Sequence, residues 1–178
     1  MIMDTPAHSR VIRVIHWITI LLIATMIPTA FVMEDVEPGA LQNALYNFHR
    51  SAGITILALT LLRLVVRLID PPAPLPASVT AFQALTAHGV HALLYLTLLV
   101  NPLVGWAATS AFGAKISVFG LFTMPALIER DRELARSLFD VHEILGTAML
   151  VLLGLHVLGA LYHQFISRDA VFKRIVTG

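Results

Sequence analysis

The sequence predicts an all-α integral membrane protein, a bundle of four transmembrane helices. Hydrophobic residues make up 57% of its 178 residues and charged residues only 13%, whereas about a quarter of a soluble domain is charged. The mean hydropathy of +0.81 points the same way. Four apolar stretches reach the ~20 residues that a helix needs to cross a bilayer. No internal repeat is visible, so we expect one domain over residues 1–178.

The stretches are separated by connections of different character. The first stretch is interpreted as a retained helix, because it is too long for the apolar part of a signal peptide and leads into the acidic Glu34-Asp35. The proline-rich connection 70–80 is expected to be stiff and extended. The longest connection, 112–137, contains a polar segment that favours a short surface helix at 129–136. The predicted spans are residues 11–33, 46–69, 84–111 and 138–166.

Basic residues predict that both termini lie in the cytoplasm, because lysine and arginine are enriched in cytoplasmic loops. With four spans, one side receives Arg10, Arg13, Arg63, Arg67, Arg168, Lys173 and Arg174. The first loop on the other side carries Glu34, Asp35 and Glu37. The last loop is a complication, since its acidic residues are mixed with Lys115, Arg130, Arg132 and Arg136.

Charge and cysteine usage exclude several classes of function. The net charge is only +1, which argues against nucleic acid as a partner. The chain has no cysteine. Disulfides, iron–sulfur ligation and covalent haem attachment through C-x-x-C-H are therefore excluded. Any haem would be held by axial ligands and packing alone, as in b-type sites.

Four histidines lie inside or at the edges of the apolar stretches: His16, His49, His142 and His156. An imidazole in a bilayer is costly, so such a residue is a candidate functional site. His142 and His156 are 14 residues apart. At ~100° and ~1.5 Å per residue, they share one helix face at depths ~21 Å apart. This spacing predicts two metal centres stacked across the bilayer.

The depths of the four histidines match in pairs. His16 should lie level with His156 near the cytoplasmic side, and His49 level with His142 near the periplasmic side. Two bis-histidine sites for haem b follow, and bis-imidazole ligation suits electron transfer rather than oxygen binding. The alternative for any single histidine is a hydrogen bond to a neighbouring helix or a place beside a water cavity.

Glycines and arginines share helix faces with these histidines. Gly53 and Gly146 each follow a histidine by four residues, where a flat macrocycle needs the backbone close by. Arg67 follows His49 by 18 residues, which is five turns, and Arg63 lies one turn nearer. Both arginines are suited to pairing with haem propionates. The alternative is that they only snorkel to the interface and set the orientation.

Three further histidines, His88, His91 and His163, fall near the cytoplasmic side. They are candidates for a quinone pocket, in which an imidazole donates to a quinone carbonyl and handles its proton. The alternative is that they are solvated at the interface. The H-x-x-H pair could also bind zinc, but no third ligand is evident. His8 is expected at the surface.

Seven motifs carry a resemblance that covers nearly the whole chain: SRVIRVIHW, FHRSAGITIL, RLVVRL, AHGVHALLY, FGLFTMP, VHEILG and GLHVLGALYH. In them the chain resembles the bacterial cytochrome b561 family of small four-helix di-haem membrane proteins. The resemblance is specific, because four histidine motifs recur in order with similar spacing.

The resemblance implies two haem b groups in a four-helix bundle of the bacterial inner membrane. The ligands it implies fall on His16, His49, His142 and His156, the four residues that depth and periodicity select. It also implies a redox protein linked to ubiquinone. A similar member of the family acts as a superoxide oxidase, whereas other members are subunits that serve other redox partners.

Superoxide would need a positive entrance on the periplasmic side because it is a small anion. Lys115, Arg50 and Arg136 are the cations expected there, and Lys115 is the least neutralised by nearby acids. We therefore expect Lys115 and Arg50 to act on the donor, with electrons passing through the His49–His142 haem to the other haem or to ubiquinone. Trp106 and the last loop could frame a quinone site on this side instead.

Three other functions compete with a superoxide oxidase. An electron-carrier subunit for another redox partner needs the same haems, so the sequence does not separate the two. A metal or solute transporter should place its ligands at one midplane site or show inverted repeats, and the sequence shows neither. A purely structural anchor leaves the histidines unexplained.

Overall fold

The computed structural model describes residues 8–176 and contains four long helices, as the sequence predicts. All four are long and apolar enough to cross a membrane. They are α1 (Arg10–Val32), α2 (Ala40–Ile69), α3 (Ala81–Phe112) and α4 (Arg132–Leu161). Shorter elements are β1 (Ser117–Val118), β2 (Phe122–Thr123), the π-helix η1 (Tyr162–Ser167) and α5 (Lys173–Val176).

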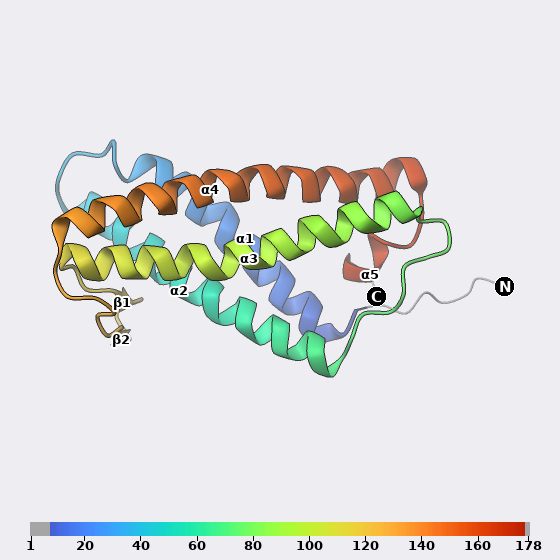
Figure 1. The fold of residues 1–178 in the computed structure, drawn as a ribbon, viewed down its shortest axis with the longest axis horizontal. Helices are drawn as coiled ribbons and strands as arrows, with labels where there is room; N and C mark the ends of the chain where they lie inside the picture. The colour runs from blue at the N-terminus through green and yellow to red at the C-terminus, as the bar shows by residue number, and fades with distance from the viewer. Residues whose placement is uncertain (1–7, 177–178) are drawn as a thin grey trace.

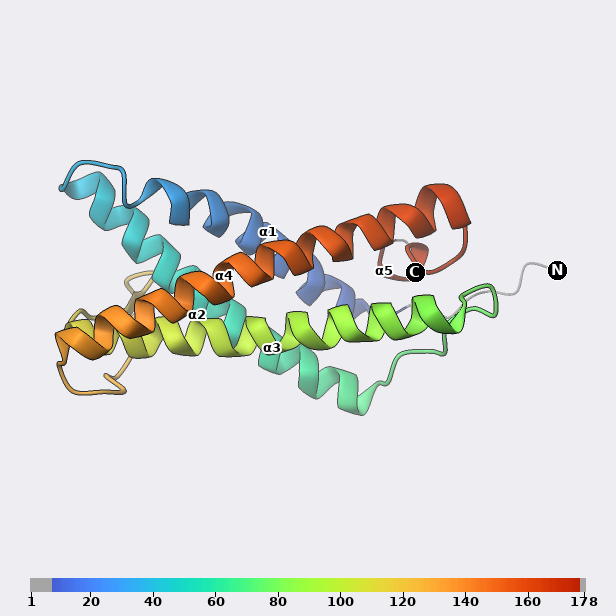
Figure 2. The ribbon, with the colours of Figure 1, turned by 45° about the horizontal axis from the view of Figure 1, so that its top comes forward.

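The helices form two antiparallel pairs. In Figures 1 and 2, α3 and α4 run side by side along the long axis, and α1 and α2 cross them obliquely. The start of α1 and the helix α5 lie at one end of the bundle, which we call the terminal end. The β1–β2 hairpin lies at the other end, which we call the hairpin end. Large apolar side chains are exposed along all four helices, as lipid-facing helices require.

Two helices begin six residues earlier than predicted, and the other two begin one and three residues earlier. The helix α2 starts at Ala40 rather than residue 46. The segment 129–136, predicted as a separate surface helix, instead contains the start of α4 at Arg132. The Asp131 carboxylate accepts hydrogen bonds from the backbone N–H groups of Glu133 and Leu134, both at 3.0 Å. This N-cap lets the apolar helix extend outward through polar residues.

The hairpin in the loop between α3 and α4 was not predicted. Its strands are too short to show alternation in the sequence, and its turn depends on positive φ angles at Phe119 (48°) and Gly120 (75°). Ser51 on α2 anchors it, because the Ser51 hydroxyl accepts from the Phe119 N–H at 3.0 Å. Its one proton is shared between the carbonyl oxygens of Asn47 (2.7 Å) and Ser117 (3.1 Å).

The C-terminal segment folds back over the terminal end. The buried Arg174 donates to the carbonyl oxygens of Ala73 (3.2 Å) and Pro74 (2.8 Å) in the proline-rich connection. The Trp17 indole on α1 donates to the Ile175 carbonyl at 3.2 Å. These contacts tie α1, the connection 70–80 and the C-terminal segment together at the terminal end.

Candidate haem sites

The four intramembrane histidines lie in two pairs at different levels of the bundle. The ring centroids of His16 and His156 are 6.2 Å apart, with the ring planes at 86°. Those of His49 and His142 are 6.0 Å apart, with the planes at 81°. We call these the terminal-end pair and the hairpin-end pair. The same histidines were expected to pair because their depths match. Their role as haem ligands stays a prediction.

The spacing within each pair fits an iron between two imidazoles. A metal–nitrogen bond of about 2 Å, with the ring centroid about 1 Å further out, separates the two centroids by about 6 Å. Both pairs meet this distance. His91 lies beside His156 with a centroid separation of 5.1 Å, which is too short for the same arrangement. His16 is therefore the better partner for His156.

The hairpin-end pair has a side chain oriented for ligation. His142 Nδ1 lies 3.0 Å from the backbone carbonyl oxygen of Asn101 on α3. Because that oxygen can only accept, Nδ1 carries the proton and Nε2 is left as a base able to bind a metal. The Nδ1 atom of His49 is buried, and this imidazole interacts with the Met26 backbone on α1.

The terminal-end pair has a different environment. Arg63 Nη1 donates to Nδ1 of His16 at 3.0 Å. A neutral His16 that accepts at Nδ1 carries its proton on Nε2, so this hydrogen bond is incompatible with iron at Nε2 of that tautomer. Arg63 would have to turn away from His16 when an iron is bound there.

The two arginines predicted to bind propionates face into the bundle. The guanidinium carbons of Arg63 and Arg67 each lie 5.8 Å from the ring centroid of Tyr95 on α3. The Tyr95 hydroxyl is buried without a hydrogen-bond partner in the described part of the chain, and so is Arg63 Nε. Their inward orientation argues against the snorkelling alternative, and their pairing with propionates stays a prediction. Tyr95 was not singled out from the sequence.

Glycines near the pairs leave different amounts of room. A Cβ atom at Gly53 would meet no atom within 4 Å, and one at Gly146 would lie 3.8 Å from Asn101 Nδ2. Gly53 therefore leaves open volume one turn from His49, as a flat macrocycle needs, whereas the Asn101 side chain packs against Gly146. The tightest approach involves Gly105 on α3, where a Cβ would lie 2.8 Å from His142 Cε1. Sequence reasoning missed Gly105.

The histidines predicted for a quinone pocket have separate surroundings. His91 contacts the His156 ring, whereas His163 Nδ1 lies 2.6 Å from the Asp169 carboxylate. His88 is exposed. The pKa of Asp169 is lowered, because hydrogen bonds from the Val171 N–H and from the Ser167 and His163 side chains outweigh the opposing effect of burial.

His8 is partly buried rather than fully at the surface as predicted. Its backbone N–H donates to the Arg174 carbonyl at 3.1 Å. Burial lowers the pKa of His8, and the nearby Arg63, Arg67 and Arg174 lower it further.

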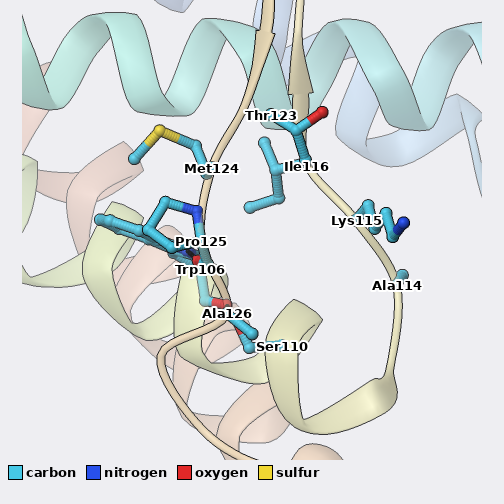
Figure 3. A pocket seen from close by; sticks show the side chains of 9 residues that line it. All are labelled: Trp106, Ser110, Ala114, Lys115, Ile116, Thr123, Met124, Pro125 and Ala126. Carbon is cyan, nitrogen blue, oxygen red and sulfur yellow. Dashed lines mark hydrogen bonds between the residues drawn. The ribbon is translucent and has the colours of Figure 1, made fainter.

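The cations predicted to attract superoxide lie at the hairpin end. Lys115 is exposed and lines a cavity of about 140 Å³ together with Trp106 and Pro125 (Figure 3). In Figure 3 the Lys115 amine points away from Trp106 and Pro125. The Trp106 indole donates to the Pro125 carbonyl at 2.9 Å and holds the last loop against α3. The Arg50 guanidinium carbon lies 5.2 Å from the Tyr46 ring centroid.

Comparison with known proteins identifies the family. The model of the family described as "Prokaryotic cytochrome b561" matches residues 7–178. This chain belongs to the prokaryotic cytochrome b561 family. As a member of this family, the chain is a multi-pass membrane protein that transfers electrons, and the family implies b-type haem. This finding argues against the transporter and the structural anchor.

Three relatives are similar to this chain over nearly its whole length. Cytochrome b561 homolog 2 of Escherichia coli (strain K12) is 31% identical over 97% of this chain and 93% of its own length. A probable superoxide oxidase, CybB of Yersinia pestis, is 28% identical over 91% of each chain. A cytochrome b562 of Cereibacter sphaeroides is 24% identical over 96% of each chain. The superoxide oxidase name indicates an oxidoreductase among the relatives of this cytochrome b561 protein.

Proposed function

We propose that this cytochrome b561 protein holds two haem b groups and passes electrons from a periplasmic one-electron donor, superoxide, to ubiquinone in the bacterial inner membrane. One observation carries the proposal. Two histidine pairs, spaced for bis-imidazole ligation, lie at two levels of a membrane-spanning bundle. Such an arrangement suits electron transfer across the bilayer.

The haems would supply the one-electron chemistry, and the chain would bind and orient them. His49 and His142 would hold the haem at the hairpin end, and His16 and His156 the haem at the terminal end. Arg63 and Arg67 would pair with propionates of the terminal-end haem. With the terminal end in the cytoplasm, as the basic residues predict, the hairpin end meets the periplasm.

The electron balance is simple. Two superoxide ions each lose one electron and become two molecules of O₂. One ubiquinone gains the two electrons and two protons and becomes ubiquinol. Lys115 and Arg50 at the hairpin end favour the approach of the anion. The quinone would lie at the terminal end, where His88, His91 and His163 are the candidate residues to contact it.

A second function is favoured by the names of relatives. Two of the three are named only as cytochromes, with no substrate. A carrier subunit that receives electrons from another redox protein would use the same two haem sites. The two functions differ in whether superoxide alone reduces the protein.

The decisive experiment adds superoxide to the purified full-length protein under anaerobic conditions with a soluble ubiquinone analogue. We expect reduced haem bands and stoichiometric ubiquinol. A Lys115→Gln variant should lower kcat/KM for superoxide by about threefold at low salt. Arg10→Gln, an equal charge change at the exposed start of α1 on the opposite side, is the control. Haems that stay oxidised in superoxide would leave the carrier function in place.

A further inference from the structure

We propose that α3, which supplies neither histidine of the hairpin-end pair, positions His142 through the Asn101 carbonyl and the bare backbone of Gly105. This inference rests on the proposed haem site at the hairpin end, and it concerns how that site is built. The proposed substrate and acceptor play no part in it.

The His142 ring is fixed at two points on one turn of α3. Its Nδ1 atom donates to the Asn101 carbonyl at 3.0 Å. Gly105 is four residues further along, so it lies one turn beyond Asn101 on the same face. A Cβ on Gly105 would lie 2.8 Å from Cε1, 3.0 Å from Nδ1 and 3.5 Å from Nε2 of His142. The ring therefore occupies the space that any side chain at position 105 would take.

Glycine is required here for close approach rather than for an unusual backbone conformation. Position 105 lies inside the regular helix α3, where an alanine would itself be favoured over glycine by about 1 kcal/mol. Among the helical glycines, Gly53, Gly89, Gly154 and Gly159 could each accept a Cβ without any contact within 4 Å. Gly105 is the one where a Cβ meets an imidazole ring.

The acceptor is a backbone atom, so substitution of Asn101 does not remove it. The Asn101 side chain is buried, and its Nδ2 would lie 3.8 Å from a Cβ at Gly146. It therefore packs against α4 one turn away from His142. Changing Asn101 alters this packing but leaves the carbonyl in place, whereas a side chain at position 105 displaces the imidazole from that carbonyl.

Displacement of the ring has a defined chemical consequence. A metal-binding histidine normally donates its other N–H to a carbonyl or carboxylate, which fixes its tautomer and makes it a more basic ligand. A more basic ligand favours the oxidised metal. Loss of the Asn101 contact should therefore weaken retention of the hairpin-end haem or raise its midpoint potential, and leave the terminal-end haem unchanged.

The test compares Gly105→Ala with Gly89→Ala, a matched change in the same helix. We expect two haems per chain in the native protein and in Gly89→Ala, with unchanged potentials. Gly105→Ala should lose one haem, or show one potential raised and one unaltered in a redox titration. If Gly105→Ala matches Gly89→Ala in both haem content and potentials, the proposal is overturned.

A double variant keeps the test independent of haem binding. In His142→Ala the clashing ring is gone, so adding Gly105→Ala should cost no further stability, whereas it should be clearly destabilising in the native background. An equal cost in both backgrounds would overturn the proposal. A native protein without haem would overturn the proposed function, whereas two intact haems that superoxide fails to reduce would remove only its substrate.

Discussion

The two histidine pairs have nearly equal spacing but different surroundings. At the hairpin end, His142 contacts the Asn101 backbone carbonyl, an acceptor that no side-chain motion or protonation alters. At the terminal end, His16 accepts from the Arg63 guanidinium, and His156 lies against the His91 ring. One site is thus oriented by helix backbone, and the other is surrounded by side chains that can move.

This difference indicates that the hairpin-end site is preorganised for a metal and the terminal-end site is not. The His142 tautomer that the Asn101 carbonyl selects is the one a metal at Nε2 requires. At the terminal end, the His16–Arg63 hydrogen bond must break before iron can bind Nε2 of a neutral ring. Preorganisation increases affinity because the cost of ordering is already met in the free protein. We therefore expect the hairpin end to bind haem more readily than the terminal end.

The largest expected effect comes from removing His142. His142→Ala should lower the haem content from two to one per chain, because bis-histidine ligation at the hairpin end is lost. A haem assay per chain, with His88→Ala as a control, measures this directly. If both haems persist, the pairing of His49 with His142 as ligands is wrong.

The next largest effect is expected on the midpoint potential of the terminal-end haem alone. Arg63→Gln removes a positive charge beside the terminal-end pair, and a nearby cation favours the reduced, more electron-rich state. We expect a lower midpoint potential for that haem, by an energy on the order of 1–2 kcal/mol. Redox titration of the two haems tests this, with Arg50→Gln shifting only the hairpin-end haem. A change in both haems would contradict separate sites.

A smaller effect is expected where the hairpin meets α2. Ser51→Ala removes the bonds to the Ser117 carbonyl and the Phe119 N–H of the hairpin, together with the bond back to Asn47 within α2. The cost should be about 1–3 kcal/mol, measured as a lower melting temperature. Ser137→Ala is the control, since within residues 8–176 the exposed Ser137 hydroxyl bonds only back to Glu133 in α4. Equal melting temperatures would mean that Ser51 does not anchor the hairpin.

The helices and the histidine pairs could be predicted because both depend on side-chain periodicity. Four apolar stretches give four helices, and a separation of 14 residues places His142 and His156 on one face at two depths. The start of α4 was misplaced because its first turns carry polar residues. Hydropathy marks the apolar core of a helix and not its extension beyond the membrane.

The contacts that distinguish the two pairs could not be predicted. The Asn101 carbonyl is a backbone atom, so no side-chain type in the sequence marks it. Gly105 stands in an apolar stretch, where a glycine usually serves helix packing. Only the packing of α4 against α3 shows that the His142 ring lies against it. The Arg63–His16 bond likewise joins two helices whose relative rotation the sequence does not give.

The smallest expected effect concerns pH and again separates the two ends. Asp169 pairs with His163 at the terminal end, and hydrogen bonds lower its pKa below the ordinary value of about 3.9. A carboxyl whose folded pKa is lowered stabilises the fold above its unfolded pKa. That stabilisation is lost as the pH falls from about 4 through the lower folded value.

Asp169→Asn should therefore lower the melting temperature at pH 7, by an energy of at most about 1 kcal/mol, and this difference should disappear in strong acid. At the hairpin end Ser51→Ala should cost the same at both pH values, because its hydrogen bonds join uncharged groups. The expected difference is that charge stabilises the terminal end at Asp169, whereas neutral hydrogen bonds stabilise the hairpin end at Ser51. A loss of stability that depends on pH for Ser51→Ala, or one that does not for Asp169→Asn, would contradict it.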